Sequence, residues 1–422
     1  MKRQAIMAMQ LAFASMILLS ISGCFKDNCS HTYTIYRPIY KTVTEVRANM
    51  KSGAPRAVEN PGKLYVYGNY IFLNESQEGI HIIDNSQPTS PRNIAFISIP
   101  GNVDMAVNGS TLYADSHRDL IAFDISNPKQ AVAKKFLNNV FPHRDSYYTN
   151  YSAAFNPDSV TMVAGWTTKD TVVDCETYRV YYSQYYANSG PDMMGGYAAP
   201  RMGGSGGSMA RFTLMEDKLY TVTTSHLKTF DISNPQDPVF TTETQPGNWN
   251  IETIYPMKDK LFIGTSSGMY IYDASNGNNP TIMGTFAHAR GCDPVVADND
   301  YAYVTLRSGN ACDGFTNQLD VVGISNLMTP TLVKTYKMTN PHGLSKDGNL
   351  LFICDGKDGL KVYDATNIHD LKLLKHVKGM ETYDVIAWNK IALVVTKSAL
   401  YQFDYTNAND IRLISNIKLN KF

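Results

Sequence analysis

The stretch Phe123-Asp124-Ile125-Ser126-Asn127-Pro128 recurs almost unchanged at residues 230–235, and weaker copies follow along the chain. The weaker copies begin at Ile83, Tyr272, Val322, Tyr363 and Phe403, and a doubtful copy begins at Val173. Asp, Ser and Asn side chains bond nearby backbone N–H groups, while Pro fixes φ and ends a hydrogen-bonded ladder. The stretch therefore predicts a turn after a strand, and its Asp is expected to shape that turn rather than to bind a ligand.

The spacing of these copies predicts the fold. Successive copies lie 40 to 57 residues apart, and from Lys63 onward short alternating segments are separated by Gly, Asn, Asp and Pro. Four short strands in a unit of this length are typical of a β-propeller blade. The period-two alternation and the abundance of Val, Ile, Tyr and Thr exclude helical repeats. We predict an all-β propeller of about eight four-stranded blades, with seven as the alternative.

Residues 209–244 form the clearest unit, and residues 141–208 the poorest. Strands of the clear unit are expected at 209–214, 218–223, 227–232 and 239–244. The poor unit contains a Tyr/Gly-rich insertion at about 178–208. Its Gly-rich half cannot pack a core. Its Tyr side chains either contact a protein or sugar partner or cover the blade below.

The N-terminus has the features of an export signal. Lys2 and Arg3 precede an apolar run, and we predict that residues 1–23 are a lipoprotein signal peptide that is cleaved just before Cys24. The sequence Ile21-Ser22-Gly23-Cys24 is similar to a bacterial lipobox, in which Cys24 would carry the lipid. An ordinary secretory signal or a membrane helix is the alternative, but the run is short for a span of about 20 residues. We expect a tether with a possible edge strand at 24–56 and the propeller at 57–422.

This reading places the protein at the outer membrane, on its surface or its periplasmic side. The pair Lys26-Asp27 resembles a surface-export signal, although only one acidic residue is present. Lys+Arg and Asp+Glu are 38 each, so no net field favours nucleic acid. The expected partners are the membrane, through the lipid, and an unidentified protein or glycan; the protein itself is expected to be a monomer.

Two cysteines are candidates for a disulfide. Cys292 and Cys312 flank a hairpin and a long loop. In an oxidising compartment their pairing would close about 20 residues and stabilise by roughly 3 kcal/mol. Two free thiols are the alternative.

Polar residues near the starts of the innermost strands form a candidate axial site. Alignment of the repeats places there Asp104, Arg211, Glu252, Asp293 and His342. They either hold a ligand at the mouth of the channel or only solvate it. No loop or spacing typical of a metal site, Walker loop or dinucleotide fingerprint is found, so we expect no cofactor and assign no catalytic residue.

The repeats themselves point to a known group. Gly79-Ile80-His81-Ile82-Ile83-Asp84 and Gly359-Leu360-Lys361-Val362-Tyr363-Asp364 resemble LVIVD repeats, and the whole chain resembles the lipoproteins that carry them. The resemblance implies a propeller at the cell envelope and no assigned reaction. We therefore expect a non-catalytic binding or scaffolding protein. The alternative is a hydrolase or lyase that acts on a glycan or small molecule at the axial mouth.

Overall fold

The computed structural model describes residues 30–142, 148–149, 155–174, 205–245, 250–289, 291, 294–308 and 315–418. The chain divides into two compact units, residues 1–38 with 166–192 and residues 39–165 with 193–422. In the first unit, Thr34 of β1 (Ser30–Thr42) donates its hydroxyl to Asp170 of β12 (Thr161–Asp174) across 2.7 Å. β1, β12 and the short β11 (Tyr148–Thr149) are the strands of one sheet.

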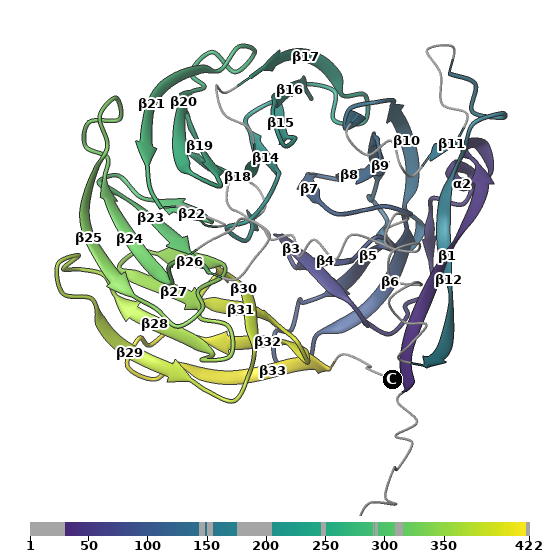
Figure 1. The fold of residues 1–422 in the computed structure, drawn as a ribbon. Helices are drawn as coiled ribbons and strands as arrows, with labels where there is room; N and C mark the ends of the chain where they lie inside the picture. Colours follow the sequence, from purple (N-terminus) through teal and green to yellow (C-terminus); the bar gives the residue numbers. More distant parts are fainter. Residues whose placement is uncertain are drawn as a thin grey trace, which may run out of the picture. The chain divides into compact units, whose positions relative to one another are not determined.

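The second unit contains seven blades among its described residues, each with four consecutive antiparallel strands (Figure 1). Blade 1 is β3 (Pro61–Tyr67), β4 (Tyr70–Glu75), β5 (Gly79–Asp84) and β6 (Arg92–Ser98). Blade 2 is β7 (Met105–Asn108), β8 (Thr111–Ser116), β9 (Asp119–Asp124) and β10 (Val132–Leu137). Blade 3 is β14 (Phe212–Met215), β15 (Lys218–Val222), β16 (Leu227–Asp231) and β17 (Val239–Thr244). Blade 4 is β18 (Ile251–Met257), β19 (Lys260–Thr265), β20 (Gly268–Asp273) and β21 (Thr281–Ala287).

The remaining three blades follow the same order. Blade 5 is β22 (Val295–Ala297), β23 (Tyr301–Leu306), β24 (Gln318–Gly323) and β25 (Thr331–Lys337). Blade 6 is β26 (Leu344–Asp347), β27 (Leu350–Cys354), β28 (Leu360–Asp364) and β29 (Lys372–Val377). Blade 7 is β30 (Thr382–Trp388), β31 (Ile391–Thr396), β32 (Ala399–Asp404) and β33 (Arg412–Lys418).

The all-β propeller class is confirmed, but the first-choice count of eight blades is corrected to seven for the described residues. The described parts of 141–208 contribute β11, β12 and β13 (Ser205–Gly206), and these strands do not form a four-stranded blade. The doubtful motif copy, Val173-Asp174, ends β12 rather than the third strand of a blade. A long insertion between blades 2 and 3 has the length of an extra repeat without its pattern.

The ring closes between the first and last blades. The inner strand β30 contacts β3, and apolar side chains of both blades share one core cluster. Gln402 and Asn85 exchange amide hydrogen bonds of 2.7 and 3.0 Å, and Ser415 donates to the Pro88 carbonyl. Among the described residues, side-chain hydrogen bonds and a shared apolar core therefore close this junction.

The chain also extends both edges of blade 1. The two-residue strand β2 (Ser52–Gly53) pairs with the outer strand β6, and β13 pairs with the inner strand β3. Just before β2 lies helix α2 (Val43–Ala48), which Thr42 and Glu45 begin with a reciprocal capping box. No helix in the described part of the chain has the length and hydropathy of a membrane span.

The repeated motif forms turns, as the sequence predicts. The Asp carboxylate accepts the backbone N–H two residues further on at 2.8–3.0 Å in six copies. The motif Asn does the same at 3.0–3.2 Å, for example Asn127 with Lys129 and Asn407 with Asn409. These bonds satisfy the backbone between the third and fourth strands of each blade.

Each of the seven blades has an irregularity at the same place in its outermost strand. One extra residue lies opposite the position just before the motif Asp or its replacement, for example Thr241 in blade 3 and Met283 in blade 4. The same register shift occurs in the other five blades. A bulge twists an exposed edge and so opposes pairing with another chain.

At six of the seven blade junctions, a tyrosine hydroxyl of one blade donates a hydrogen bond to the backbone or a side chain of the neighbouring blade. The six bonds run from Tyr65 to Val107, Tyr113 to Pro235, Tyr220 to Gly277, Tyr255 to Ala297, Tyr336 to Ile368, and Tyr405 to Asp347. A Tyr ring fills the space between blades while its hydroxyl reaches a polar group. This explains part of the high Tyr content.

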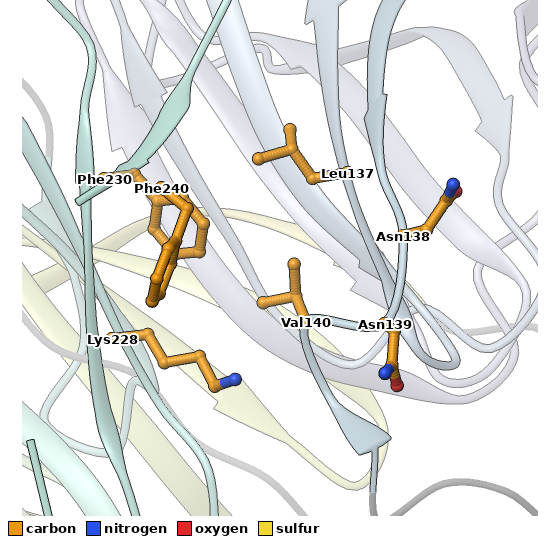
Figure 2. A pocket seen from close by; sticks show the side chains of 7 residues that line it. All are labelled: Leu137, Asn138, Asn139, Val140, Lys228, Phe230 and Phe240. Atoms are coloured by element: carbon orange, nitrogen blue, oxygen red, sulfur yellow. The ribbon is translucent and has the colours of Figure 1, made fainter. Parts of the chain in front are cut away.

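Between blades 2 and 3 the junction opens into a pocket of about 220 Å³ (Figure 2). Its lining residues are Leu137, Asn138, Asn139, Val140, Lys228, Phe230 and Phe240. Figure 2 shows Leu137 and Val140 facing the two Phe rings, whereas Asn138 extends away from them. The pocket therefore lies between the outer strands β10 and β17, away from the centre of the ring.

Candidate functional site

Four of the five predicted axial residues lie in the described part of the chain, at the starts of innermost strands, and two of these four are joined by a hydrogen bond. Asp104 and Arg211 directly precede β7 and β14, Glu252 is the second residue of β18, and His342 lies two residues before β26. The Arg211 backbone N–H donates to the Asp104 carboxylate. Asp293 lies outside the described residues.

Asp104 is held in a buried ion pair that the sequence did not predict. Lys63 Nζ lies 2.7 Å from Asp104 Oδ2, and both side chains are 2% exposed. Burial raises the pKa of Asp104 and lowers that of Lys63, and the mutual attraction opposes both shifts. A buried pair of this kind joins blades 1 and 2 and leaves no free carboxylate for a ligand.

The neighbouring carboxylate, Asp115, is also used within the fold. Its Oδ1 accepts the backbone N–H groups of Val103 and Asp104 at 2.7 and 2.9 Å, and the Asn102 amide at 2.9 Å. Asn102 in turn accepts the amide of Asn74 at 2.7 Å. Carboxylate and amide groups thus fix the loop that leads into β7.

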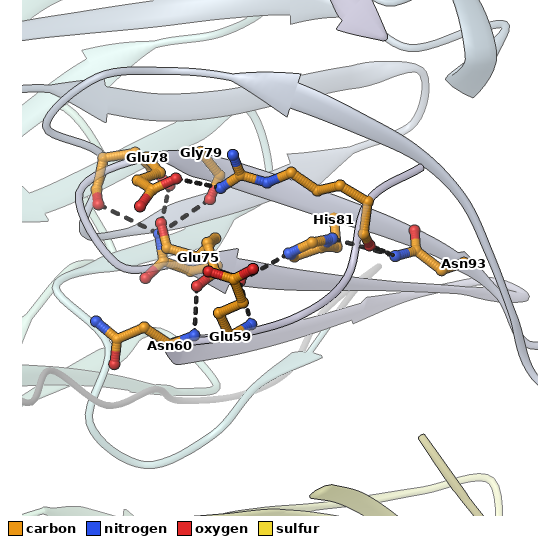
Figure 3. Close-up of polar contacts among 10 residues, drawn as sticks. Glu59, Asn60, Glu75, Glu78, Gly79, His81 and Asn93 are labelled. Atoms are coloured by element: carbon orange, nitrogen blue, oxygen red, sulfur yellow. Dashed lines mark hydrogen bonds and ion pairs between the residues drawn. The ribbon is translucent and has the colours of Figure 1, made fainter. Parts of the chain in front are cut away.

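Two other blades use a carboxylate in the same way. In blade 1, Glu75 accepts the backbone N–H groups of Glu59 and Asn60 and faces His81 Nε2 at 2.9 Å (Figure 3). Burial raises the pKa of Glu75, but these bonds outweigh it and the pKa lies below its usual value. In blade 6, Asp355 accepts Thr339 and Asn340 N–H groups and the Lys361 ammonium. Each carboxylate anchors the loop entering an innermost strand.

His342 is neutral at ordinary pH. Burial, followed by the nearby Arg307 charge, lowers its pKa to about 3. The Arg307 guanidinium lies 2.6 Å from His342 Nδ1, and the Asn340 amide lies 3.3 Å from Nε2. A neutral imidazole that accepts from a guanidinium could orient a polar group, but its pKa is far from that of an efficient general base at neutral pH.

A segment of the chain crosses the centre of the ring. Residues 205–206 pair with β3 of blade 1, Ser208 Oγ accepts the Leu344 N–H of blade 6 at 2.8 Å, and Ala210 C=O accepts the Ile254 N–H of blade 4 at 2.8 Å. Blades 1, 6 and 4 lie around different parts of the ring, so residues 205–210 occupy the axial channel between them. Ser208 and Ala210 are buried. From the sequence, residues 205–208 are expected at the end of the insertion and residues 209–210 at the start of a strand, and their position at the axis is not predicted.

Gly207 explains why this segment is rich in glycine. A Cβ at Gly207 would lie 2.1 Å from Asp384 Oδ2, and a Cβ at Gly343 would lie 2.0 Å from Asp384 Oδ1. The backbone thus approaches the Asp384 carboxylate closely from the axial segment and from the loop that enters β26 of blade 6. Residues 203–207 also match the letters Gly-x-Ser-x-Gly, but Ser205 lies in β13 beside β3 rather than at a strand-to-helix elbow.

The part of the chain that the structure describes contains no disulfide and no cluster of metal-ligating side chains. Cys24, Cys292 and Cys312 lie outside the described residues, so the predicted lipidation and disulfide stay predictions. Cys354 is a buried thiol, and burial raises its pKa well above the usual value. Within the described ranges, no three His, Cys, Asp or Glu side chains gather as metal ligands.

Comparisons with known proteins support the repeats and the fold. The LVIVD repeat family model matches residues 62–95 and 291–338. A protein from Lactobacillus plantarum of known crystal structure is similar, with 13% identity, a TM-score of 0.54, and coverage of 85% of this chain and 96% of that one. A periplasmic gluconolactonase from Pseudomonas aeruginosa has 11% identity, a TM-score of 0.50, and coverage of 85% and 96%. At such identities the likeness concerns the fold alone. No curated protein matches the chain.

Proposed function

Because this chain carries LVIVD repeats on a propeller fold, we propose that it is a lipid-anchored envelope protein whose propeller is a non-catalytic binding or scaffolding module. The lipid on Cys24 would hold it at the outer membrane, and its ligand would be an envelope protein or glycan. The ligand would bind at the blade junctions or the outer rim rather than at the axis.

One observation carries the proposal: the chain's own residues 205–210 occupy the axial channel, where many propellers leave a pocket. A ligand at that level would have to displace β13 from β3 and Ser208 from Leu344. The rim, in contrast, keeps exposed apolar side chains, among them Phe240 at 50% and Leu332 at 52% exposure.

The polar groups at the axis support the same reading. Asp104, Asp115 and Asp355 accept backbone N–H groups and cationic or amide side chains, which are bonds that maintain a fold. An acid–base site needs a group whose pKa lies near the working pH. Of the candidates, His342 has a pKa of about 3 because it is buried beside Arg307.

An enzyme acting on a glycan or small molecule is the second candidate. The fold of a gluconolactonase is similar at a TM-score of 0.50, but the fold by itself hosts many functions. Glu252 is a half-buried carboxyl group at the second position of the inner strand β18. It interacts with the rest of the chain.

The decisive experiment compares turnover with binding. Purified wild type and the double variant E252A/H342A are assayed on lactones and glycosides, with thermal unfolding as the control for folding. We expect no turnover that depends on these residues. An activity that the wild type has and a folded double variant lacks would overturn the proposal. Membrane fractionation of C24S tests the anchor separately: we expect the variant to leave the membrane fraction, and retention there would contradict lipidation.

A further inference from the structure

The pocket between blades 2 and 3 combines an aromatic wall with a polar end. Phe240 is 50% exposed and stands edge-to-face with the buried Phe230, with ring centroids 5.8 Å apart at 70°. Val140 and Leu137 form the opposite wall (Figure 2). Lys228 and Asn139 lie at the same end of the pocket, beyond the rings in this view.

The Asn139 side of this pocket is held rigidly. Asn139 has a left-handed backbone with φ of 59°, and its N–H donates to Asp119 Oδ1 at 3.0 Å. Asp119 is itself paired with Arg47 at 2.8 Å. The Arg118 guanidinium donates to Asn139 Oδ1, so the oxygen is engaged and the amide N–H₂ group is the part that can donate to a ligand.

The Lys228 side offers both a donor and an acceptor without a net charge. Lys228 Nζ lies 2.6 Å from Glu243 Oε2, and His226 Nε2 lies 3.4 Å from the other carboxylate oxygen. An anionic ligand would be repelled by Glu243, and a cationic ligand by Lys228. A wholly apolar ligand would bury the amide and the ion pair without returning their hydrogen bonds, which costs free energy.

We propose that this junction pocket binds one neutral sugar ring, a deepening that rests on the proposed binding function. A pyranose has an apolar face that can lie against Phe240 and hydroxyl groups that both accept and donate. Its hydroxyls would accept from the Asn139 amide and Lys228 and would donate to Glu243. A volume of about 220 Å³ is below the range of drug-sized pockets, roughly 300 to 1,000 Å³. It suits one ring of a longer glycan, whose remainder would run over the rim.

The test uses the full chain in detergent and a panel of methyl pyranosides, with affinities from calorimetry and contacts from saturation-transfer NMR. F240A removes the aromatic wall. N139D removes the amide donor while keeping a residue that tolerates the left-handed backbone. I282A is the matched control, because Ile282 occupies the same register position in blade 4 and is 53% exposed.

We expect at least one pyranoside to bind, F240A and N139D each to weaken its binding by about tenfold, and I282A to leave it unchanged. Absence of binding by every pyranoside, or equal losses in F240A and I282A, would overturn the sugar site. Stronger binding of an apolar probe such as toluene, with N139D unaffected, would assign the pocket to an apolar side chain of a protein partner instead. Neither result concerns turnover. The wider proposal of a non-catalytic binding protein is therefore tested separately, by the turnover assay of E252A/H342A.

Discussion

His81 Nε2 lies 2.9 Å from the Glu75 carboxylate in blade 1, and six residues separate the two along the chain. The same offset joins Lys361 to Asp355 at 2.5 Å in blade 6. Both carboxylates also accept two consecutive backbone N–H groups of the loop that enters the innermost strand. Two repeats therefore anchor the loop before the innermost strand with the same geometry. The partner of the carboxylate is an imidazole in blade 1 and an ammonium group in blade 6.

This relationship predicts the effect of replacing His81. H81A leaves Glu75 buried without its side-chain partner, and removal of one member of a buried pair costs about 3 kcal/mol or more. H81K restores the arrangement of blade 6 and should recover a large part of the loss. Denaturant unfolding of wild type, H81A and H81K measures both effects.

Equal destabilisation by H81K and H81A would contradict this equivalence between the blades. K361A is the matched variant in blade 6, where Lys361 also contacts Asp358 at 2.6 Å. We expect K361A to lower the free energy of unfolding as H81A does.

A second prediction concerns acid pH. The pKa of His342 is about 3 in the folded protein because of burial and Arg307, against about 6.5 in an unfolded chain. Between these values the unfolded state binds the proton and the folded state does not, so stability falls as pH is lowered through this window. The slope from this residue is at most about 1.4 kcal/mol per pH unit. H342Q removes the titrating group, so its stability should depend less on pH between 4 and 6.5.

The measurement is denaturant unfolding of wild type and H342Q at several pH values from 4 to 8. The many motif Asp residues titrate equally in both proteins, so the difference between the two curves isolates His342. Parallel curves throughout would show that His342 takes up its proton in the folded state as easily as in the unfolded one.

The sequence predicted the features that depend on neighbours along the chain. The Asp84 and Asp404 turns bond to Ser86 and Thr406 over two residues, so the motif carries its own geometry. Strands of the clear unit at 218–223 and 239–244 match β15 and β17 within a residue. Its first strand begins at Phe212 rather than 209, because residues 209–210 still belong to the segment at the axis, where the Ala210 carbonyl accepts from Ile254 of blade 4.

Features that depend on distant contacts were not predictable in this way. Nothing near Lys63 in the sequence indicates that it meets Asp104, 41 residues away. The described residues form seven blades, the alternative count rather than the first choice of eight, because the insertion after blade 2 has the length of a repeat without its pattern. Residues 205–210 look like a flexible linker by composition, yet Ser208 and Ala210 are buried, because Gly allows the backbone to approach Asp384. A high content of Gly and Ser predicts that an isolated segment is flexible. It does not predict the contacts that the segment makes inside the propeller.

The tyrosines at the blade junctions give a third prediction. Tyr113 donates to the Pro235 carbonyl at 2.8 Å from a fully buried ring. Y113F keeps the ring and leaves that carbonyl without this donor, which should cost about 1 kcal/mol. Y70F is the control, since the Tyr70 hydroxyl has no hydrogen bond among the described residues. Thermal and denaturant unfolding should show a loss in Y113F and almost none in Y70F; similar values for both would mean that the hydroxyl bond contributes nothing across the junction.

The last prediction tests whether residues 205–210 are part of the folded core. A Cβ at Gly207 would lie 2.1 Å from the Asp384 carboxylate, which is buried and also lies close to Gly343 of blade 6. G207A must therefore displace either the segment or Asp384, and overpacking of this kind costs about 1–3 kcal/mol. Gly165 provides the control, because a Cβ there would meet no atom within 4 Å. We expect G207A, but not G165A, to lower the midpoint of unfolding and to increase hydrogen exchange at Leu344, whose N–H donates to Ser208. Unchanged exchange at Leu344 in a stable G207A protein would show that the position of the segment does not depend on this close approach.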